Sequence, residues 1–284
     1  MSRSLLYFAP GSGLGHLTRA VALCIELREL GFEPEIATNS PFAQAVARMV
    51  RLRVTSLATR SWAVDAPRLL AERAPRVAVA DTFPQGFRGE WKLRPETPMI
   101  HVARRLRLES YDAPPDAWRG FALTVAIEPL APEHDARLSG ELLRLPGWVR
   151  LAPGRIATPP PAPLVGALDE GAALVVHSGP PAEVERLMAC ARGERVVAST
   201  TAAGLSAPVF DYFPAANLYR RARNIFTGAG YNSMADTIHL RSRHTAIAFH
   251  RRFDDQHGRL AVVAGESGID STRAAAEALA SVAL

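Results

Sequence analysis

The sequence predicts an α/β protein whose two domains are each built on a parallel, doubly wound sheet and face each other across a cleft. Three observations support this fold class. Short apolar runs alternate with amphipathic segments, and the runs are continuously apolar, as expected of strands covered on both faces. A proline-rich stretch separates two such series of runs. The length of 284 residues is enough for two domains.

The first series predicts an N-terminal Rossmann-like domain over residues 1–165. Its strands are expected at residues 4–9, 35–38, 53–57, 76–81, 99–103 and 123–127. Its helices are expected from residue 17 to about residue 31, at 42–50 and at about 66–73. Ser40 and Pro41 suit the N-cap and first residue of the second helix. Ligands of such sheets bind beyond the carboxyl ends of the strands.

The proline-rich stretch predicts a semi-rigid linker at the end of this domain. Prolines gather at positions 146, 153, 159, 160, 161 and 163. We expect the run Pro159–Pro163 to form neither a helix nor a central strand. A second, shorter Rossmann-like domain then covers residues 166–284. Its strands are expected at 173–177, 195–199, 208–210, 224–227 and 245–249, and its helices at 181–188 and 271–284.

Composition and charge exclude several classes of protein. Hydrophobic residues make up 48% of the chain and no segment approaches the roughly 20 apolar residues of a membrane helix, so a cytoplasmic protein is expected. Two cysteines do not predict a disulfide framework. The net charge of +5 lies in residues 1–165, which hold 21 basic and 16 acidic residues. That basic half could contact an anionic membrane surface, whereas no nucleic-acid motif is present.

The glycine-rich loop Gly11–His16 lies between the first strand and the first helix. A dinucleotide-binding loop would read G-x-G-x-x-G, but here its third glycine is replaced by His16. A glycine turn at a helix start suits a phosphate, and a histidine there suits proton transfer beside it. The alternative is a histidine that only packs or caps the first helical turn.

A second glycine-rich segment follows the strand at 224–227. Gly228 and Gly230 allow a ligand to approach the backbone, and Asn232, Ser233 and Asp236 begin the next helix. A polar segment, His250–His257, follows the next strand and opens another helix, so it is expected to line the same cleft.

Together, the loop Gly11–His16, the segment Gly228–Asp236 and the Asp-x-Gln pattern at Asp254–Gln256 resemble the GT-B glycosyltransferases, especially the MurG-like, family 28-type UDP-sugar transferases. The resemblance implies an N-terminal domain that binds the acceptor and a C-terminal domain that binds the nucleotide sugar. It implies that His16 is the general base. The residues that it assigns to the donor are Gly13, Gly15, Ser178, Tyr212, Phe213, Gly228, Gly230, Asn232, Ser233, Asp236, Asp254, Asp255 and Gln256.

Within that assignment, residues 228–233 would hold the diphosphate and Asp236 the ribose, in place of the family's glutamate. Tyr212 and Phe213 would contact the base, and residues 254–256 the sugar hydroxyls. The chain departs from the family in its short second domain and in the segment 177–181, where Pro180 and Pro181 remove amide donors from a phosphate loop.

The expected reaction is a single inverting displacement at the anomeric carbon, without metal ion or cofactor. The sequence has neither an Asp-x-Asp pair nor a His/Cys cluster at ligand spacing. Asp81 ends one predicted strand of the N-terminal domain and Arg104 follows another, and both are expected to contact the acceptor. The alternatives are that Asp81 caps the next turn and that Arg104 belongs to a solvated charged loop. His101 and His177 are expected to be core or loop histidines.

Two other functions remain open from the sequence. One is a nucleotide-sugar hydrolase with a GT-B-like fold, in which water replaces the acceptor; such enzymes have a similar Gly-x-Gly-His segment, here Gly13–His16. The other is a non-catalytic protein that binds a nucleotide sugar or a partner, as the short second domain would allow. The oligomeric state is not predicted.

Overall fold

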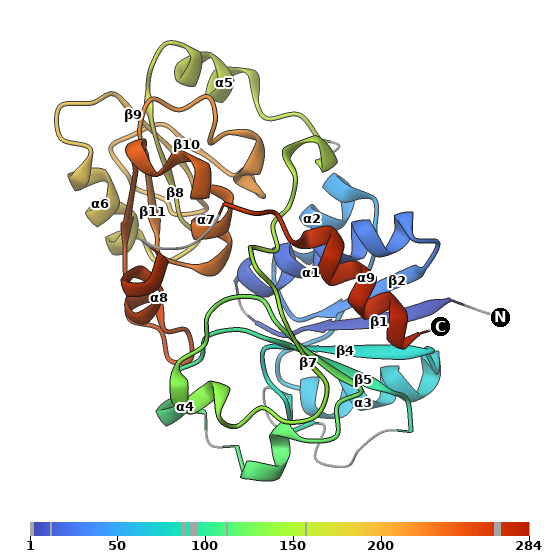
Figure 1. The fold of residues 1–284 in the computed structure, drawn as a ribbon. Helices are drawn as coiled ribbons and strands as arrows, with labels where there is room; N and C mark the ends of the chain where they lie inside the picture. Colours follow the sequence, from blue (N-terminus) through green and yellow to red (C-terminus); the bar gives the residue numbers. More distant parts are fainter. Residues whose placement is uncertain are drawn as a thin grey trace.

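The computed structural model describes residues 3–11, 13–86, 89–90, 96–111, 113–156, 158–263 and 268–283. It contains two α/β domains, each with one parallel sheet, which confirms the expected fold class (Figure 1). Ser12, part of the first glycine-rich loop, lies outside the described residues. None of the helices within these ranges has the length and apolar character needed to cross a membrane.

The N-terminal domain has a seven-stranded sheet in the order β3-β2-β1-β4-β5-β6-β7. Alternate side chains of the central strand β1 face opposite layers, as the two-residue repeat of a strand requires. Leu5 and Tyr7 belong to the core that includes α1 and α2, whereas Leu6 and Phe8 pack in the core that includes α3. The strands are β1 (Ser4–Ala9), β2 (Glu33–Thr38), β3 (Arg53–Ser56), β4 (Val77–Asp81), β5 (Met99–Ala103), β6 (Leu123–Ala126) and β7 (Leu142–Arg144). The helices are α1 (Gly15–Glu29), α2 (Ala43–Val50), α3 (Trp62–Arg73) and α4 (Pro132–Asp135).

The C-terminal domain has a five-stranded sheet in the order β10-β9-β8-β11-β12. Its central strands β8 and β11 are neighbours, so the loops that follow them open at the same edge. The strands are β8 (Ala173–Val176), β9 (Val196–Ser199), β10 (Val209–Phe210), β11 (Ile225–Gly228) and β12 (His244–Ile247). The helices are α5 (Ala162–Asp169), α6 (Pro181–Cys190), α7 (Tyr231–Asp236), α8 (Gln256–Val263) and α9 (Thr272–Val282).

The structure corrects the sequence prediction in the region of the linker. Strand β7 and helix α5 were not expected, and the boundary expected at residue 165 falls inside α5. Pro163 lies in the first turn of α5, although a helix was not expected across Pro159–Pro163. A proline is tolerated there because the first amides of a helix have no carbonyl partner within it.

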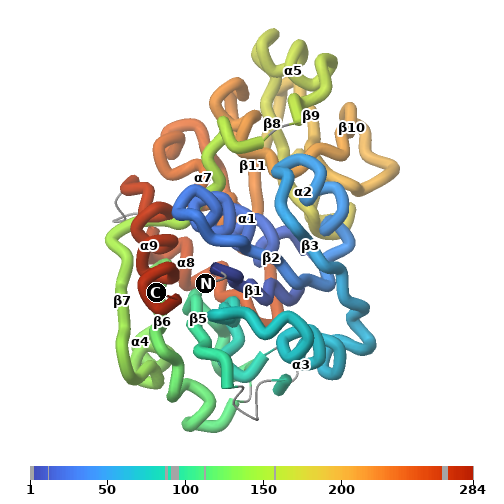
Figure 2. Tube along the Cα trace, turned by 90° about the vertical axis from the view of Figure 1, so that its right-hand side faces the viewer, coloured from blue at the N-terminus to red at the C-terminus, as the bar shows by residue number. Residues whose placement is uncertain are grey.

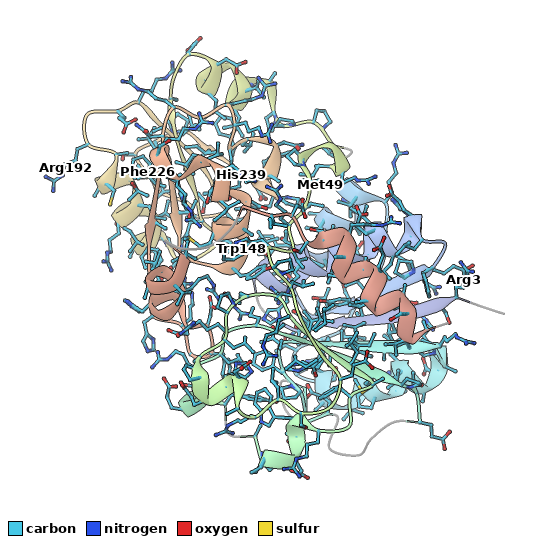
Figure 3. The ribbon with its side chains drawn as sticks, viewed as in Figure 1. Arg3, Met49, Trp148, Arg192, Phe226 and His239 are labelled. Carbon is cyan, nitrogen blue, oxygen red and sulfur yellow. The ribbon has the colours of Figure 1, made fainter. Side chains whose placement is uncertain are left out.

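The two domains share a buried junction. Helix α9 returns from the second domain to pack on α1 of the first (Figures 1 and 2). Trp148 lies between the domains (Figure 3), where its ring contacts Tyr231 at a centroid distance of 5.2 Å. Arg259 of α8 donates to both carboxylate oxygens of Glu128, at 2.7 and 2.8 Å, and both side chains are buried. These contacts hold the carboxyl edges of the two sheets on either side of a shared cavity.

Candidate active site

A cavity of about 660 Å³ opens between the carboxyl edges of the two sheets. Its wall is formed by the loop from β1 to α1, the loop from β8 to α6, the turn from β11 to α7, the segment 213–215 and residues 251–254 with Gln256. Phe83, Arg104 and Tyr219 also line it. The sequence-predicted residues that the structure brings to this wall are Gly13, Gly15, His16, Arg104, Ser178, Phe213, Gly228, Gly230, Asn232, Ser233, Asp236, Asp254 and Gln256. Residues predicted from both halves of the chain therefore meet in one place.

His16 is held in the first turn of α1 by a carboxylate beneath it. Its Nδ1 lies 2.5 Å from Oδ2 of Asp81, the last residue of β4. Arg19, one turn further along α1, donates to both oxygens of the same carboxylate, at 2.9 and 2.5 Å. The Tyr7 hydroxyl donates to it as well, at 3.2 Å. With Nδ1 occupied by Asp81, the Nε2 atom of His16 remains for a ligand in the cavity.

The charges of this cluster keep Asp81 ionised and His16 neutral. Burial alone would raise the pKa of Asp81, but the Arg19 guanidinium and His16 hold it well below its usual range. Burial lowers the pKa of His16, and Asp81 only partly offsets this effect. A neutral imidazole fixed by an ionised carboxylate can accept a proton at neutral pH.

After Asp81, Thr82 is buried behind the cavity wall and Phe83 forms part of that wall beside His16. Thr82 has a φ of +71°, which is unusual for a β-branched residue, and its hydroxyl accepts from Arg19 at 3.1 Å and Arg104 at 3.3 Å. Phe83 follows and stacks on the His16 ring at a centroid distance of 5.7 Å. Such backbone strain gathers at functional sites, where the surrounding contacts hold it in place.

The turn after β11 faces His16 from the C-terminal domain. Asn232 donates from Nδ2 to the carbonyl of Gly15 at 2.8 Å, so this turn is tied directly to the loop that carries His16. A Cβ atom on Gly13, Gly15 or Gly230 would meet no atom within 4 Å beyond the glycine's own chain neighbours and helix backbone, so there is space for a ligand beside these glycines. The carboxylate of Asp236 has neither a hydrogen bond nor an ion pair with the described residues, and burial raises its pKa to about 7.

The Asp-x-Gln segment mostly joins the two domains. Asp254 accepts from Arg104 and, at 2.8 Å, from Arg259. Gln256 donates to Asp254 at 3.2 Å, and its Oε1 accepts from the backbone of Phe249 at 3.0 Å. The two side chains reach the cavity wall with much of their hydrogen-bonding capacity already used.

Three predicted site residues do not reach the cavity wall. Asp81, expected to contact the acceptor, is sealed beneath His16 by Arg19 and Tyr7. The hydroxyl of Tyr212 donates to the carbonyl of Thr158 at 2.9 Å and packs inside the second domain. Asp255 pairs with Arg105 of the first domain at 2.7 Å, and it lines a separate pocket.

The structure adds residues that sequence reasoning missed. Arg19 and Phe83 join the His16 side of the cavity, and His177 and Arg251 the opposite side. The three-residue spacing from His16 to Arg19 places both on one face of a helix, and this signal was available in the sequence. His177 ends a strand predicted at 173–177, but nothing in the sequence showed that its side chain faces the cavity. His101 is a core histidine, as expected, and its side chain is fully buried.

Comparison with known proteins supports the fold but not a closer relationship. No protein-family model and no curated protein matches the sequence. Among solved structures, the glycosyltransferase SnogD from Streptomyces nogalater is 16% identical with a TM-score of 0.58, covering 100% of this chain and 95% of SnogD. The Streptomyces sp. SF2575 glycosyltransferase SsfS6 is 13% identical with a TM-score of 0.57, covering 99% and 95%.

The spinosyn rhamnosyltransferase SpnG, in a complex with spinosyn aglycone, is 16% identical with a TM-score of 0.54, covering 98% of this chain and 95% of SpnG. SsfS6 has also been solved with thymidine diphosphate. The chain has a GT-B-like fold. At these identities the likeness shows the fold alone, and it does not single out the MurG-like group within GT-B glycosyltransferases.

Proposed function

We propose that the protein is an inverting glycosyltransferase that moves a sugar from a nucleoside diphosphate to an acceptor hydroxyl without a metal ion or cofactor. The observation that carries this proposal is the His16–Asp81 pair, which faces the glycine-rich turn at residues 228–233 across one cavity. The nucleotide is a pyrimidine nucleoside diphosphate: uridine diphosphate by the resemblance to MurG-like enzymes, or thymidine diphosphate as bound by SsfS6.

In this reaction the neutral His16 accepts the proton of the acceptor hydroxyl at Nε2 as that oxygen attacks the anomeric carbon. Asp81 accepts the hydrogen bond from Nδ1 and stabilises the imidazolium that forms. The bond between the anomeric carbon and the diphosphate oxygen breaks, and the nucleoside diphosphate leaves. A single displacement inverts the anomeric configuration.

The two halves of the cavity wall suit different parts of the substrates. The space beside Gly13, Gly15 and Gly230 allows a phosphate group to approach closely, and the carboxylate of Asp236, which has no ion pair with the described residues, suits ribose hydroxyls. Beside His16 the wall includes the aromatic rings of Phe83 and Phe253, which suit an acceptor with an apolar body.

The first experiment asks which nucleotide the protein binds. Thermal unfolding is followed with uridine, thymidine and guanosine diphosphates and with NAD. A ligand at 100 times its dissociation constant adds about 2.7 kcal/mol to the free energy of unfolding. Stabilisation by a pyrimidine nucleoside diphosphate supports the donor site, whereas no stabilisation by any of the diphosphates argues against the proposed function.

The second experiment removes the proposed base. His16→Ala should lower acceptor-dependent release of the nucleoside diphosphate by about 10²–10⁴-fold and leave nucleotide binding intact. His239→Ala is the control, because His239 is exposed and does not line the cavity (Figure 3). Full release without an acceptor would show a hydrolase instead, and an unchanged rate in His16→Ala would rule out this histidine as the base.

A further inference from the structure

His177 lies on the opposite side of the cavity from His16, at the carboxyl end of β8. Its Nε2 lies 2.6 Å from Oε2 of Glu183, in the first turn of α6. Arg251 donates to both oxygens of that carboxylate. Phe249 contacts the imidazole ring at a centroid distance of 5.0 Å. The ring is therefore fixed by a carboxylate, a guanidinium and an aromatic side chain.

The free nitrogen of His177 faces the glycine-rich turn after β11. A Cβ atom on Gly228 would lie 3.0 Å from Cε1 and 3.2 Å from Nδ1 of His177, so the ring occupies the space beside this glycine. Among the described residues Nδ1 has no hydrogen-bond partner, and it is not one of the polar atoms sealed from solvent. Nδ1 is thus open to the cavity at the position where the turn 228–233 is expected to hold phosphate.

The backbone next to His177 has few donors for an anion. Pro180 and Pro181, at the start of α6, have no N–H. The amides of Glu183 and Val184 already donate to the carbonyl of Pro180, at 3.0 and 3.4 Å. The amides of Ser178, Gly179 and Ala182 have no acceptor among the described residues, so the backbone offers a phosphate at this edge of the cavity at most these three donors, and side chains must supply any others.

The charge of the cluster depends on one proton. With a neutral imidazole, the charges of Glu183 and Arg251 cancel and the cluster has no net charge. When His177 is protonated, both ring nitrogens donate: Nε2 to Glu183, and Nδ1 to a ligand in the cavity. Burial lowers the pKa of His177, Glu183 raises it, and Arg251 lowers it. An anion bound beside the ring would raise this pKa and favour the protonated form.

We propose that His177 is a ligand of the donor's diphosphate, which it binds through Nδ1–H with uptake of a proton at the imidazole. This inference rests on the proposed function, because it needs a nucleoside diphosphate in the cavity. It assigns the anion-binding role at β8 to a side chain, in a loop where prolines have replaced amide donors.

The test measures binding and proton uptake together. Calorimetric titration of uridine and thymidine diphosphates near pH 7, in two buffers with different ionisation enthalpies, gives the affinity and the number of protons taken up. In His177→Gln the amide can still donate to Glu183 but cannot be protonated. We expect this variant to bind the diphosphate about tenfold more weakly than wild type. We also expect it to take up fewer protons per bound ligand, by a substantial fraction of one proton.

Changes in the ionisation of the ligand and of Asp236 contribute to proton uptake in both wild type and His177→Gln, so they cancel when the two values are subtracted. His239→Gln, an exposed histidine outside the cavity, should behave as wild type. Equal affinity and equal proton uptake in wild type and His177→Gln would overturn this inference alone. A lower affinity without a change in proton uptake would also overturn it, because packing would then be the cause. Wild-type protein that binds neither diphosphate overturns the proposed function and this inference together.

Discussion

A histidine and an arginine line the cavity on each side and share a carboxylate behind them, and the two clusters differ most in burial. The side chain of Asp81 is 0% exposed and that of Arg19 is 1% exposed, whereas Glu183 and Arg251 are 18% and 32% exposed. The histidines also use opposite nitrogens: His16 bonds its carboxylate through Nδ1, and His177 through Nε2. The free nitrogens, Nε2 of His16 and Nδ1 of His177, are therefore different atoms.

This difference suits two kinds of chemistry. A sealed, permanently ionised carboxylate orients an imidazole and stabilises the charge that it gains, which is what a general base needs. A carboxylate closer to solvent, already neutralised by an arginine, allows the histidine beside it to change charge when an anion binds. The two clusters have the same three types of residue, but their different burial suits His16 to accept a proton and His177 to bind an anion.

The largest effect is expected from Asp81→Asn. The amide cannot carry the charge that balances Arg19 and stabilises the imidazolium formed on His16 during the reaction, so we expect kcat to fall by about 10²–10⁴-fold. Removing one partner of a buried ion pair should also lower the free energy of unfolding by about 3–5 kcal/mol. Steady-state kinetics and urea unfolding near pH 7 measure the two effects.

Glu183→Gln is the matched substitution in the other cluster. Because Glu183 and Arg251 are partly exposed, the loss in unfolding free energy should be about 1 kcal/mol or less. Equal destabilisation by the two substitutions would mean that the difference in burial does not separate the clusters. A kcat that is unchanged in Asp81→Asn would remove the proposed role of the His16–Asp81 pair.

The next largest effect is expected in the pH dependence of kcat, on the acid side of the pH–rate profile. His16 acts as a base only when it is neutral, and burial lowers its pKa from the usual value of 6.5. The rate should therefore hold as the pH falls to about 6.5, and then drop about tenfold per unit only below the lowered pKa. Measurement of kcat at saturating substrates from pH 8 to 5 tests this, and a limb centred above pH 6.5 would contradict a buried, neutral base.

The sequence predicted the fold, and the position of several candidate site residues at one cavity, because both depend on local patterns. Continuous apolar strands and the loop Gly11–His16 are readable in order along the chain, and the structure confirms two parallel sheets and places His16 in the cavity. The partners of the site residues could not be predicted in this way. Asp81 lies 65 positions from His16, and Arg104 is 150 positions from Asp254, so only tertiary packing reveals that they pair.

The same limit explains the predicted residues that lie outside the cavity wall and the wall residues that were not predicted. Asp255 reads as a sugar ligand beside Asp254, but its carboxylate meets Arg105 of the other domain. His177 lacks a local motif, and its importance depends on Glu183, on Arg251 and on the space beside Gly228. The end of a strand locates a residue at the ligand-binding edge of a sheet, whereas tertiary packing decides which of its atoms stay free.

The smallest effect concerns Asp236, a cavity carboxylate that forms no ion pair within the described part of the chain. Arg150 lowers its pKa by less than burial raises it. Guanidinium groups lower the pKa of Asp81 and of Glu183, but burial raises that of Asp236 to about 7. A carboxyl group with a raised pKa destabilises the fold increasingly as the pH rises from about 4 to 7, because the unfolded chain ionises more easily. Asp236→Asn should therefore unfold at a higher temperature than wild type at pH 8.

The gain should be up to about 2 kcal/mol at pH 8 and smaller at pH 5, where the wild-type group is largely protonated. Thermal unfolding at both pH values measures it, with Asp211→Asn, an exposed aspartate outside the cavity, as the control. The variant should also bind nucleoside diphosphates more weakly, if the carboxylate holds the ribose. A protein that keeps an unpaired carboxylate at the expense of stability is expected to use it for a ligand, whereas a destabilised variant would show that Asp236 is stabilised by contacts within the fold.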